Sequence, residues 1–181
     1  DIAIVQLNRA LSIRQNLGEN YNIAVVYNEL GATYRSVNNY SKALENYQLA
    51  LQIRRQLADI QQIAATLINI GTIYKDINMH ETALEYYEEA LTMHQNLASE
   101  ALIAQSLNYI GGVYYKRGQF DQALDYYLSA LGYYEITDDK IENARIQNNV
   151  ALMYKNLGNY EKSLEYYQKS LELYQLITDH K

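Results

Sequence analysis

The sequence contains no cysteine, no proline and no tryptophan. Without cysteine the chain forms no disulfide and offers no thiolate to a metal. Without proline it lacks the residue that removes a helical hydrogen bond and clashes with the preceding turn, so helices can run through most of its length. Hydrophobic residues still make up 49% of the 181 residues, which is ample material for a buried core.

Long apolar runs are missing as well. No stretch approaches the roughly 18 residues that a membrane-spanning helix needs, so we predict no direct contact between this segment and a membrane. The first residues lack the basic and apolar regions of a signal peptide, and the chain starts at Asp1 rather than at methionine. We therefore expect a soluble piece of a longer protein. The sequence does not specify its compartment; the cytoplasm is favoured, with the periplasm as the alternative.

Positive charge is scarce, because 15 basic residues stand against 21 acidic ones and the net charge is −6. A nucleic-acid-binding protein needs a basic surface that displaces counterions from phosphates. We therefore predict no nucleic-acid partner.

Patterns typical of catalysis and metal binding are missing too. His80, His94 and His180 have no second ligand at the spacing of a metal site. Carboxylates such as Glu85 and Glu88 lie on helical faces open to water, whereas acid–base catalysis needs a desolvated pair that faces a pocket. The sequence predicts no metal, no cofactor and no catalytic residue, and hence a protein that is not an enzyme.

The most informative feature of the sequence is an internal repeat. Shifted by 40 positions, the chain aligns with itself without gaps, and the same residue types fall in the same columns. The best-defined columns are Tyr34, Tyr74, Tyr114 and Tyr154; Leu44, Leu84, Leu124 and Leu164; and Gly31, Gly71, Gly111 and Ala151. The predicted boundaries are a leading half repeat at 1–22 and four full repeats at 23–62, 63–102, 103–142 and 143–181.

Each repeat contains two runs with the apolar spacing of an α-helix. In the first copy Ile23, Tyr27 and Leu30 follow one another at intervals of four and three residues, and a second such run begins at Ala43. No segment alternates with a period of two. The predicted fold is therefore all-α, with about nine antiparallel helices.

Turn and capping residues separate these runs. Asparagine and glycine, which tolerate a positive φ at a helix C-terminus, stand between the two helices of a repeat, as at Asn38-Asn39. Between repeats the sequence has N-cap signals, Asp59-x-x-Gln62 and Asp139-x-x-Glu142.

Small residues in fixed columns indicate where the two helices of a repeat cross. Helices approach closely only where neither carries bulk, so we expect Gly31 and Ala50 to mark the crossing point. We expect the Tyr34 column to fill the space beside it, with its hydroxyl at an edge.

Within each copy the order of residues is Leu30-Gly31-x-x-Tyr34, then Ala43-x-x-x-Tyr47 and Ala50. This order resembles the tetratricopeptide repeat (TPR) pattern, in which L-G-x-x-Y precedes A-x-x-x-F/Y and a later alanine. HEAT and armadillo repeats share the period of 40 but not this signature. The resemblance covers essentially the whole chain and implies a right-handed α–α superhelix that binds proteins or peptides.

The period of 40 residues instead of the 34 typical of the family, and the lack of its closing proline, imply longer helices. In both respects the chain is similar to the subclass found in kinesin light chains, spindle-orientation adaptors and many bacterial signalling proteins.

In the TPR family the first helices of the repeats line a concave groove, and the resemblance implies which columns of this sequence face it. Spacings of three, four and seven residues place these columns on one helical face, away from the Leu and Tyr columns. The predicted groove residues are Asn28, Arg35, Asn69, Lys75, Asn108, Tyr109, Tyr115, Lys116, Arg145, Asn148, Asn149 and Lys155.

Five of these residues are asparagines, whose amides can both donate to and accept from a peptide backbone. In related scaffolds such asparagines hold a peptide segment, and we carry that role over as a hypothesis. The alternative is a solvated surface. Asparagine is disfavoured in helix interiors, which favours the binding role.

Charge gives a second hypothesis for the groove. Its columns hold five basic residues against two acidic ones, Glu29 and Asp76. The excess predicts a partner segment with acidic residues or a free C-terminal carboxylate. The alternative is that cations in the last turn of a helix only complement the helix dipole.

The leading functional hypothesis is a non-catalytic scaffold that binds a partner segment in the groove, as the interaction part of a larger protein of the bacterial signalling type. One alternative is a structural spacer or self-association arm without a ligand. Another is the regulatory region of an enzyme whose catalytic domain lies outside this chain. The last helix, with Leu164, Tyr167 and Leu171, lacks a polar outer face, so we predict end-to-end self-association.

Overall fold

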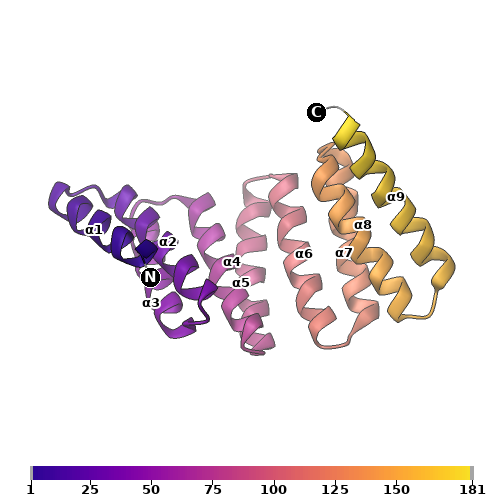
Figure 1. Ribbon diagram of the computed structural model, residues 1–181, viewed down its shortest axis with the longest axis horizontal. Helices are drawn as coiled ribbons and strands as arrows, with labels where there is room; N and C mark the ends of the chain where they lie inside the picture. The colour runs from indigo at the N-terminus through magenta and orange to yellow at the C-terminus, as the bar shows by residue number, and fades with distance from the viewer. Residues whose placement is uncertain (1, 180–181) are drawn as a thin grey trace. The chain divides into compact units, whose positions relative to one another are not determined.

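The computed structural model describes residues 2–179, and within this range every regular element is an α-helix (Figure 1). In chain order the helices are α1 (Ile2–Leu17), α2 (Asn20–Ser36), α3 (Tyr40–Gln56), α4 (Ile60–Asp76), α5 (His80–Asn96), α6 (Glu100–Lys116), α7 (Phe120–Ile136), α8 (Lys140–Asn156) and α9 (Tyr160–Asp179). The all-α prediction is confirmed for these residues; His180 lies outside them. The predicted repeat boundaries stay predictions, and the first helices start three residues before them, as α2 does at Asn20.

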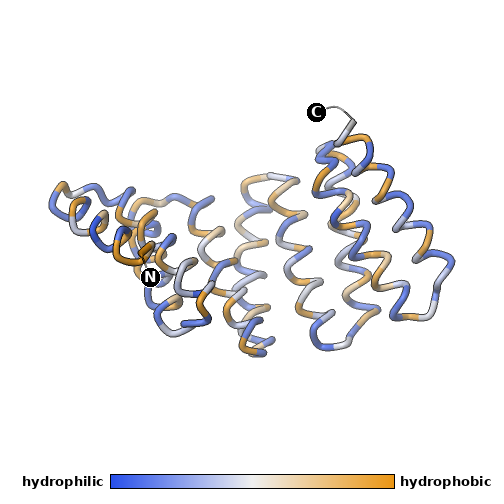
Figure 2. Tube along the Cα trace, viewed as in Figure 1, coloured by the Kyte–Doolittle hydropathy of each residue, from blue (hydrophilic) through white to orange (hydrophobic). Residues whose placement is uncertain are grey.

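Contacts divide the helices into two compact units, an N-terminal unit up to Met93 and a C-terminal unit from His94 on. In the N-terminal unit α2 packs against α1 and α3, and α3 also packs against α4. In the C-terminal unit α7 packs between α6 and α8, and α8 packs against α9. Apolar and polar residues alternate along the helices in Figure 2, as in helices with one apolar face. Each of the helices α2 to α9 contains buried residues, whereas α1 contains none.

The junctions between helices share one backbone geometry. At intervals of 20 residues a residue with positive φ follows a helix C-terminus: Gly18, Asn38, Ala58, Asn78, Ala98, Gly118, Asp138 and Gly158. At the second of these, the N–H groups of Asn38 and Asn39 donate to the carbonyls of Arg35 (2.9 Å) and Tyr34 (2.8 Å). This is the Schellman pattern, which satisfies carbonyls that a helix end leaves without partners.

The predicted N-caps between repeats are confirmed. The Asp59 carboxylate accepts a hydrogen bond from the Gln62 N–H at 3.2 Å, and Asp139 accepts one from the Glu142 N–H at 3.1 Å. Each cap supplies a partner to an N–H group that has none within its own helix.

A glycine and a tyrosine define the crossing of the two helices in a hairpin. A Cβ atom added to Gly71 in α4 would lie 2.8 Å from Cε1 of Tyr87 in α5, which is fully buried. Gly31 has the same relation to Tyr47. The expectation that the Tyr34 column fills this space was wrong, because the ring comes from the second helix.

In the later repeats, the tyrosines of the Tyr34 column stack on a different tyrosine of the second helix. Tyr74 stacks on Tyr86 with ring centroids 5.5 Å apart, and Tyr114 stacks on Tyr126 at 5.2 Å. These pairs join the two helices of a hairpin beside the glycine contact, and offset aromatic stacking adds to the area they bury.

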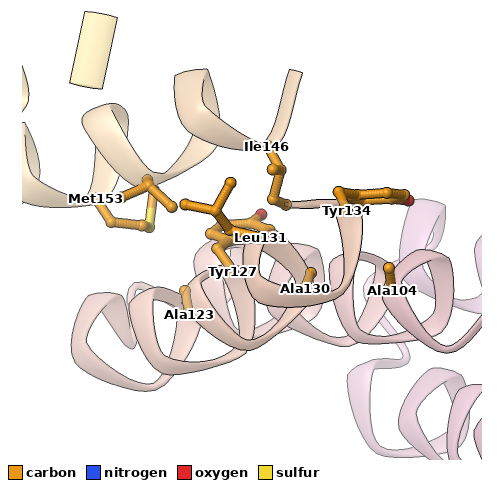
Figure 3. Close-up of a cluster of buried hydrophobic side chains, with 9 residues drawn as sticks. Ala104, Ala123, Tyr127, Ala130, Leu131, Tyr134, Ile146 and Met153 are labelled. Carbon is orange, nitrogen blue, oxygen red and sulfur yellow. The ribbon is translucent and has the colours of Figure 1, made fainter. Parts of the chain in front are cut away.

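The core of the C-terminal unit is shown in Figure 3. Ala123, Tyr127, Ala130 and Leu131 of α7 are buried together with residues of α8 such as Met153. Small residues of α7 leave room for the neighbouring helices, and the larger ones fill the space between them.

Helix α9 has one face without a partner among the described residues. Leu164 and Leu171 are 59% and 56% exposed, whereas Leu51 and Leu131, which share a column with Leu171, are buried. The predicted apolar face is confirmed for these side chains. Self-association through it stays a prediction.

We predict that Gly111→Ala lowers the free energy of unfolding by about 1–2 kcal/mol, because the new methyl group meets the buried Tyr127 ring and overpacking outweighs the gain in helix propensity. The matched control is Gly132→Ala in α7, where an added Cβ meets nothing within 4 Å. That change should stabilise by about 1 kcal/mol. Urea denaturation measures both, and equal effects would show that the glycine–tyrosine contact is not restrictive.

Ala58 has a φ of 53°, a conformation in which a Cβ atom is strained. We predict that Ala58→Gly stabilises the protein by about 0.5–1 kcal/mol, because glycine adopts positive φ without that strain. Ala32→Gly, on the exposed surface of α2, should instead destabilise by about 1 kcal/mol. Thermal unfolding monitored by circular dichroism distinguishes the two signs.

Candidate functional site

Four of the five predicted asparagines lie on neighbouring first helices and bond to one another in two pairs. Asn69 Nδ2 in α4 donates to Asn28 Oδ1 in α2 at 3.1 Å. Asn149 Nδ2 in α8 donates to Asn108 Oδ1 in α6 at 3.0 Å. Each pair therefore connects the first helices of two successive repeats and fixes the orientation of both amides.

In the C-terminal unit the second pair lies in a pocket of about 610 Å³. The pocket opens between α6 and α8, and the end of α7 contributes Tyr134 to its wall. Five of the predicted groove residues line it: Asn108, Tyr109, Arg145, Asn148 and Asn149. The structure thus brings these five together, although a role for them in binding stays a prediction.

The charged residues of the pocket are mostly acidic. Asp139 and Glu142 line it together with Arg145. Arg145 bonds to Glu142 at 2.8 Å, and its side chain is 63% exposed, so this ion pair is open to solvent and contributes little to stability.

Tyr134 forms the buried part of the pocket wall. Its side chain is only 3% exposed, and in Figure 3 its hydroxyl points away from the apolar cluster. Burial raises the pKa of Tyr134, and the negative charges of Glu142 and Asp139 raise it further. The hydroxyl therefore stays protonated at neutral pH and can both donate and accept a hydrogen bond.

The predicted basic residues are not a uniform set. Arg35 forms an ion pair with Asp76 at 2.8 Å, so that its charge is balanced within the chain, as is that of Arg145. Lys116 and Lys155 are exposed, and Lys75 is half-buried. Tyr115, the remaining predicted residue, packs on Phe120 with ring centroids 6.1 Å apart.

Sequence reasoning missed one column of second-helix residues that reaches the next first helix. Three members of this column are buried: Arg54, His94 and Tyr134. His94 bonds to Ser106 at 2.8 Å, and Arg54 bonds to Thr66. The available signal was a 40-residue column of large polar side chains in otherwise apolar stretches.

No described helix could cross a membrane, and no three His, Cys, Asp or Glu side chains in the described part of the chain gather as metal ligands would.

Helical hairpins of this kind, stacked through their side chains and with polar columns on their first helices, define a helical-repeat interaction scaffold. The tetratricopeptide repeat family model matches residues 1–56 and 62–136, and a second tetratricopeptide repeat model matches residues 144–175. The chain therefore belongs to the tetratricopeptide repeat family, a family of scaffolds that bind protein or peptide partners. No curated protein sequence matches it significantly.

Solved structures show the same fold at low sequence identity. Aspartyl phosphate phosphatase F from Bacillus subtilis matches with a TM-score of 0.89 and 17% identity, over 96% of this chain and 45% of its own. BtubC from P. vanneervenii matches with a TM-score of 0.77 and 22% identity, over 97% and 81%. RapI, in its apo form, matches with a TM-score of 0.76 and 20% identity, over 86% and 57%. The chain thus spans about half the length of two of these proteins.

The buried His94 makes stability depend on pH. Burial lowers the pKa of His94 below its usual 6.5, whereas a hydrogen bond to the backbone of Leu102 opposes this shift. Near pH 6.5 His94 therefore binds a proton in the unfolded chain but not in the folded chain. The stabilising contribution is complete above that pH and is lost as the pH falls below it.

We predict that the free energy of unfolding falls as the pH is lowered below about 6.5, because the unfolded chain gains a proton on His94 that the folded chain does not. His94→Gln, which keeps a partner for Ser106 but cannot titrate, should flatten this dependence. Urea denaturation of the variant and of the unmodified chain across the pH range measures it. An equal slope in the His94 variant would contradict the assignment.

Proposed function

We propose that the chain is a peptide-binding module and that the pocket between α6 and α8 binds the backbone of a partner segment. The observation that supports this proposal is the Asn108–Asn149 pair, held at 3.0 Å within the 610 Å³ pocket. A hydrogen bond between the two amides fixes them before a ligand arrives, which reduces the entropy lost on binding.

The pair keeps hydrogen-bonding capacity for a ligand. Asn108 uses its Oδ1 for the mutual bond and retains its Nδ2 donors, and Asn149 retains its Oδ1 acceptor. One donor and one acceptor side by side match the C=O and N–H groups that an extended or helical segment presents. Asn148 supplies a further amide on the same wall.

The wider role follows from the family and is part of the proposal. The module serves as the interaction segment of a larger protein of the signalling type, because TPR arrays present extended binding surfaces. A spacer without a ligand would not require the four amide and two aromatic side chains that line this pocket. An acidic partner is less well matched, since Asp139 and Glu142 outnumber the single cation Arg145 there.

We predict that random linear peptides displayed on phage are enriched on the immobilised chain, and that the enriched peptides lose about tenfold in affinity for Asn108→Ala and for Asn149→Ala. Fluorescence anisotropy with synthetic copies measures the affinities, and thermal melts confirm that the variants remain folded. Asn28→Ala, which breaks the other amide pair, is the matched control and should bind normally. Enriched peptides that bind all three variants equally, or no enrichment at all, would overturn the proposal.

A further inference from the structure

The N-terminal unit contains a buried guanidinium at the place that corresponds to the pocket. Arg54 reaches from α3 toward the first helices and is 5% exposed. Its Nη1 atom bonds to Thr66 Oγ1 and to the Gln62 carbonyl at 3.2 Å, and it lies 3.5 Å from Asn28 Oδ1. Burial lowers the pKa of Arg54, and the nearby Asp59 and Tyr21 oppose that shift.

The surroundings of Arg54 correspond, two repeats later, to the walls of the pocket. A shift of 80 residues converts Tyr21, Asn28, Asp59 and Gln62 into Ala101, Asn108, Asp139 and Glu142. All four of the latter line the pocket. The chain therefore contains two versions of one site, and in the first version a guanidinium of the chain itself occupies it.

The two versions of the site differ at four positions that supply or surround the guanidinium. Tyr134 stands in place of Arg54, so no guanidinium reaches this site from the second helix of the repeat, and Ile146 replaces the hydroxyl partner Thr66. Ala101 in place of Tyr21 adds room. Glu142 in place of Gln62 adds a negative charge, although its neighbour Arg145 balances that charge at the pocket mouth.

From this correspondence we infer that the pocket between α6 and α8 binds the guanidinium group of an arginine in the partner segment. This inference rests on the proposed function and specifies the side chain that the partner carries. The Asn108 amide oxygen, the Glu142 backbone carbonyl and the Asp139 carboxylate correspond to the groups around the Arg54 guanidinium. The Glu142 carboxylate adds a further acceptor on the pocket wall. Tyr109 adds an aromatic face, on which a planar guanidinium stacks better than an ammonium does.

Arg145 then has a defined place in the site. Its guanidinium already bonds to Glu142, so it competes with the arginine of the ligand for the same carboxylate. Its counterpart in the N-terminal unit is Ala65, which cannot compete with Arg54. An acidic ligand would need Arg145, whereas an arginine ligand binds better without it. The two ligand classes therefore predict opposite effects of Arg145→Ala.

The test uses the whole chain and four labelled peptide pools that differ only in a fixed central residue, which is arginine, lysine, citrulline or aspartate. Fluorescence anisotropy measures binding. We expect the arginine pool to bind about tenfold more tightly than the citrulline pool, because citrulline keeps the shape but not the charge. Glu142→Gln should reduce this preference, and Arg145→Ala should strengthen binding of the arginine pool.

A graft from the chain's own N-terminal unit provides a further variant. Tyr134→Arg combined with Ile146→Thr recreates the Arg54–Thr66 pair, and the new guanidinium should block the arginine pool. Circular dichroism shows whether this variant folds; the conservative Glu142→Gln variant tests the inference even where the graft does not fold.

The outcomes separate the two proposals. Pools that all bind equally, and that still depend on Asn108 and Asn149, would overturn the arginine site and leave the peptide-binding function standing. A preference for the aspartate pool, or weaker binding of the arginine pool to Arg145→Ala, would also overturn the arginine site. Failure of every pool to bind would overturn both proposals.

Discussion

The contact between a first-helix glycine and a second-helix tyrosine is the constraint on which the rest of the structure depends. A Cβ atom at Gly71 would come within 2.8 Å of the Tyr87 ring, so the helices of a hairpin can approach as they do only because that atom is missing. In the last repeat Ala151 stands in the glycine column, and the corresponding Tyr167 is 37% exposed. Among the described residues no further helix follows α9 to cover that ring.

Polar columns add to the apolar contacts that connect one repeat with the next. The amide pairs Asn28–Asn69 and Asn108–Asn149 join successive first helices in the same way in the two units. Arg54 and Tyr134 occupy the same column but have different surroundings. Arg54 bonds to neighbouring groups of the chain, whereas Tyr134 lines a pocket. The same backbone geometry therefore supports sites of different chemistry, and the second-helix side chain in this column determines which chemistry each site has.

Much of this arrangement could be predicted from the sequence, because the 40-residue period fixes which residues share a column. The helices, the caps at Asp59 and Asp139 and the face that carries the asparagines all follow from local rules that act within a few residues. The pocket could not be predicted. It depends on Tyr134 and Arg145, whose partners lie on other turns or other helices, and spacing along the chain does not show that Arg35 meets Asp76. Spacing also placed the wrong tyrosine beside Gly31, since either ring could have filled the same gap.

The backbone of the chain repeats with a shorter period than its side chains do. Residues with positive φ recur every 20 residues, and α2 and α3 both have 17 residues, so the backbone repeats with each helix. Side chains repeat only with each pair of helices. Loss or duplication of a single helix would leave the backbone pattern intact. It would, however, exchange first and second helices in all later repeats and place large tyrosines at positions that need glycine. Growth of such an array by recombination is therefore restricted to even numbers of helices, and the restriction lies in the side chains alone.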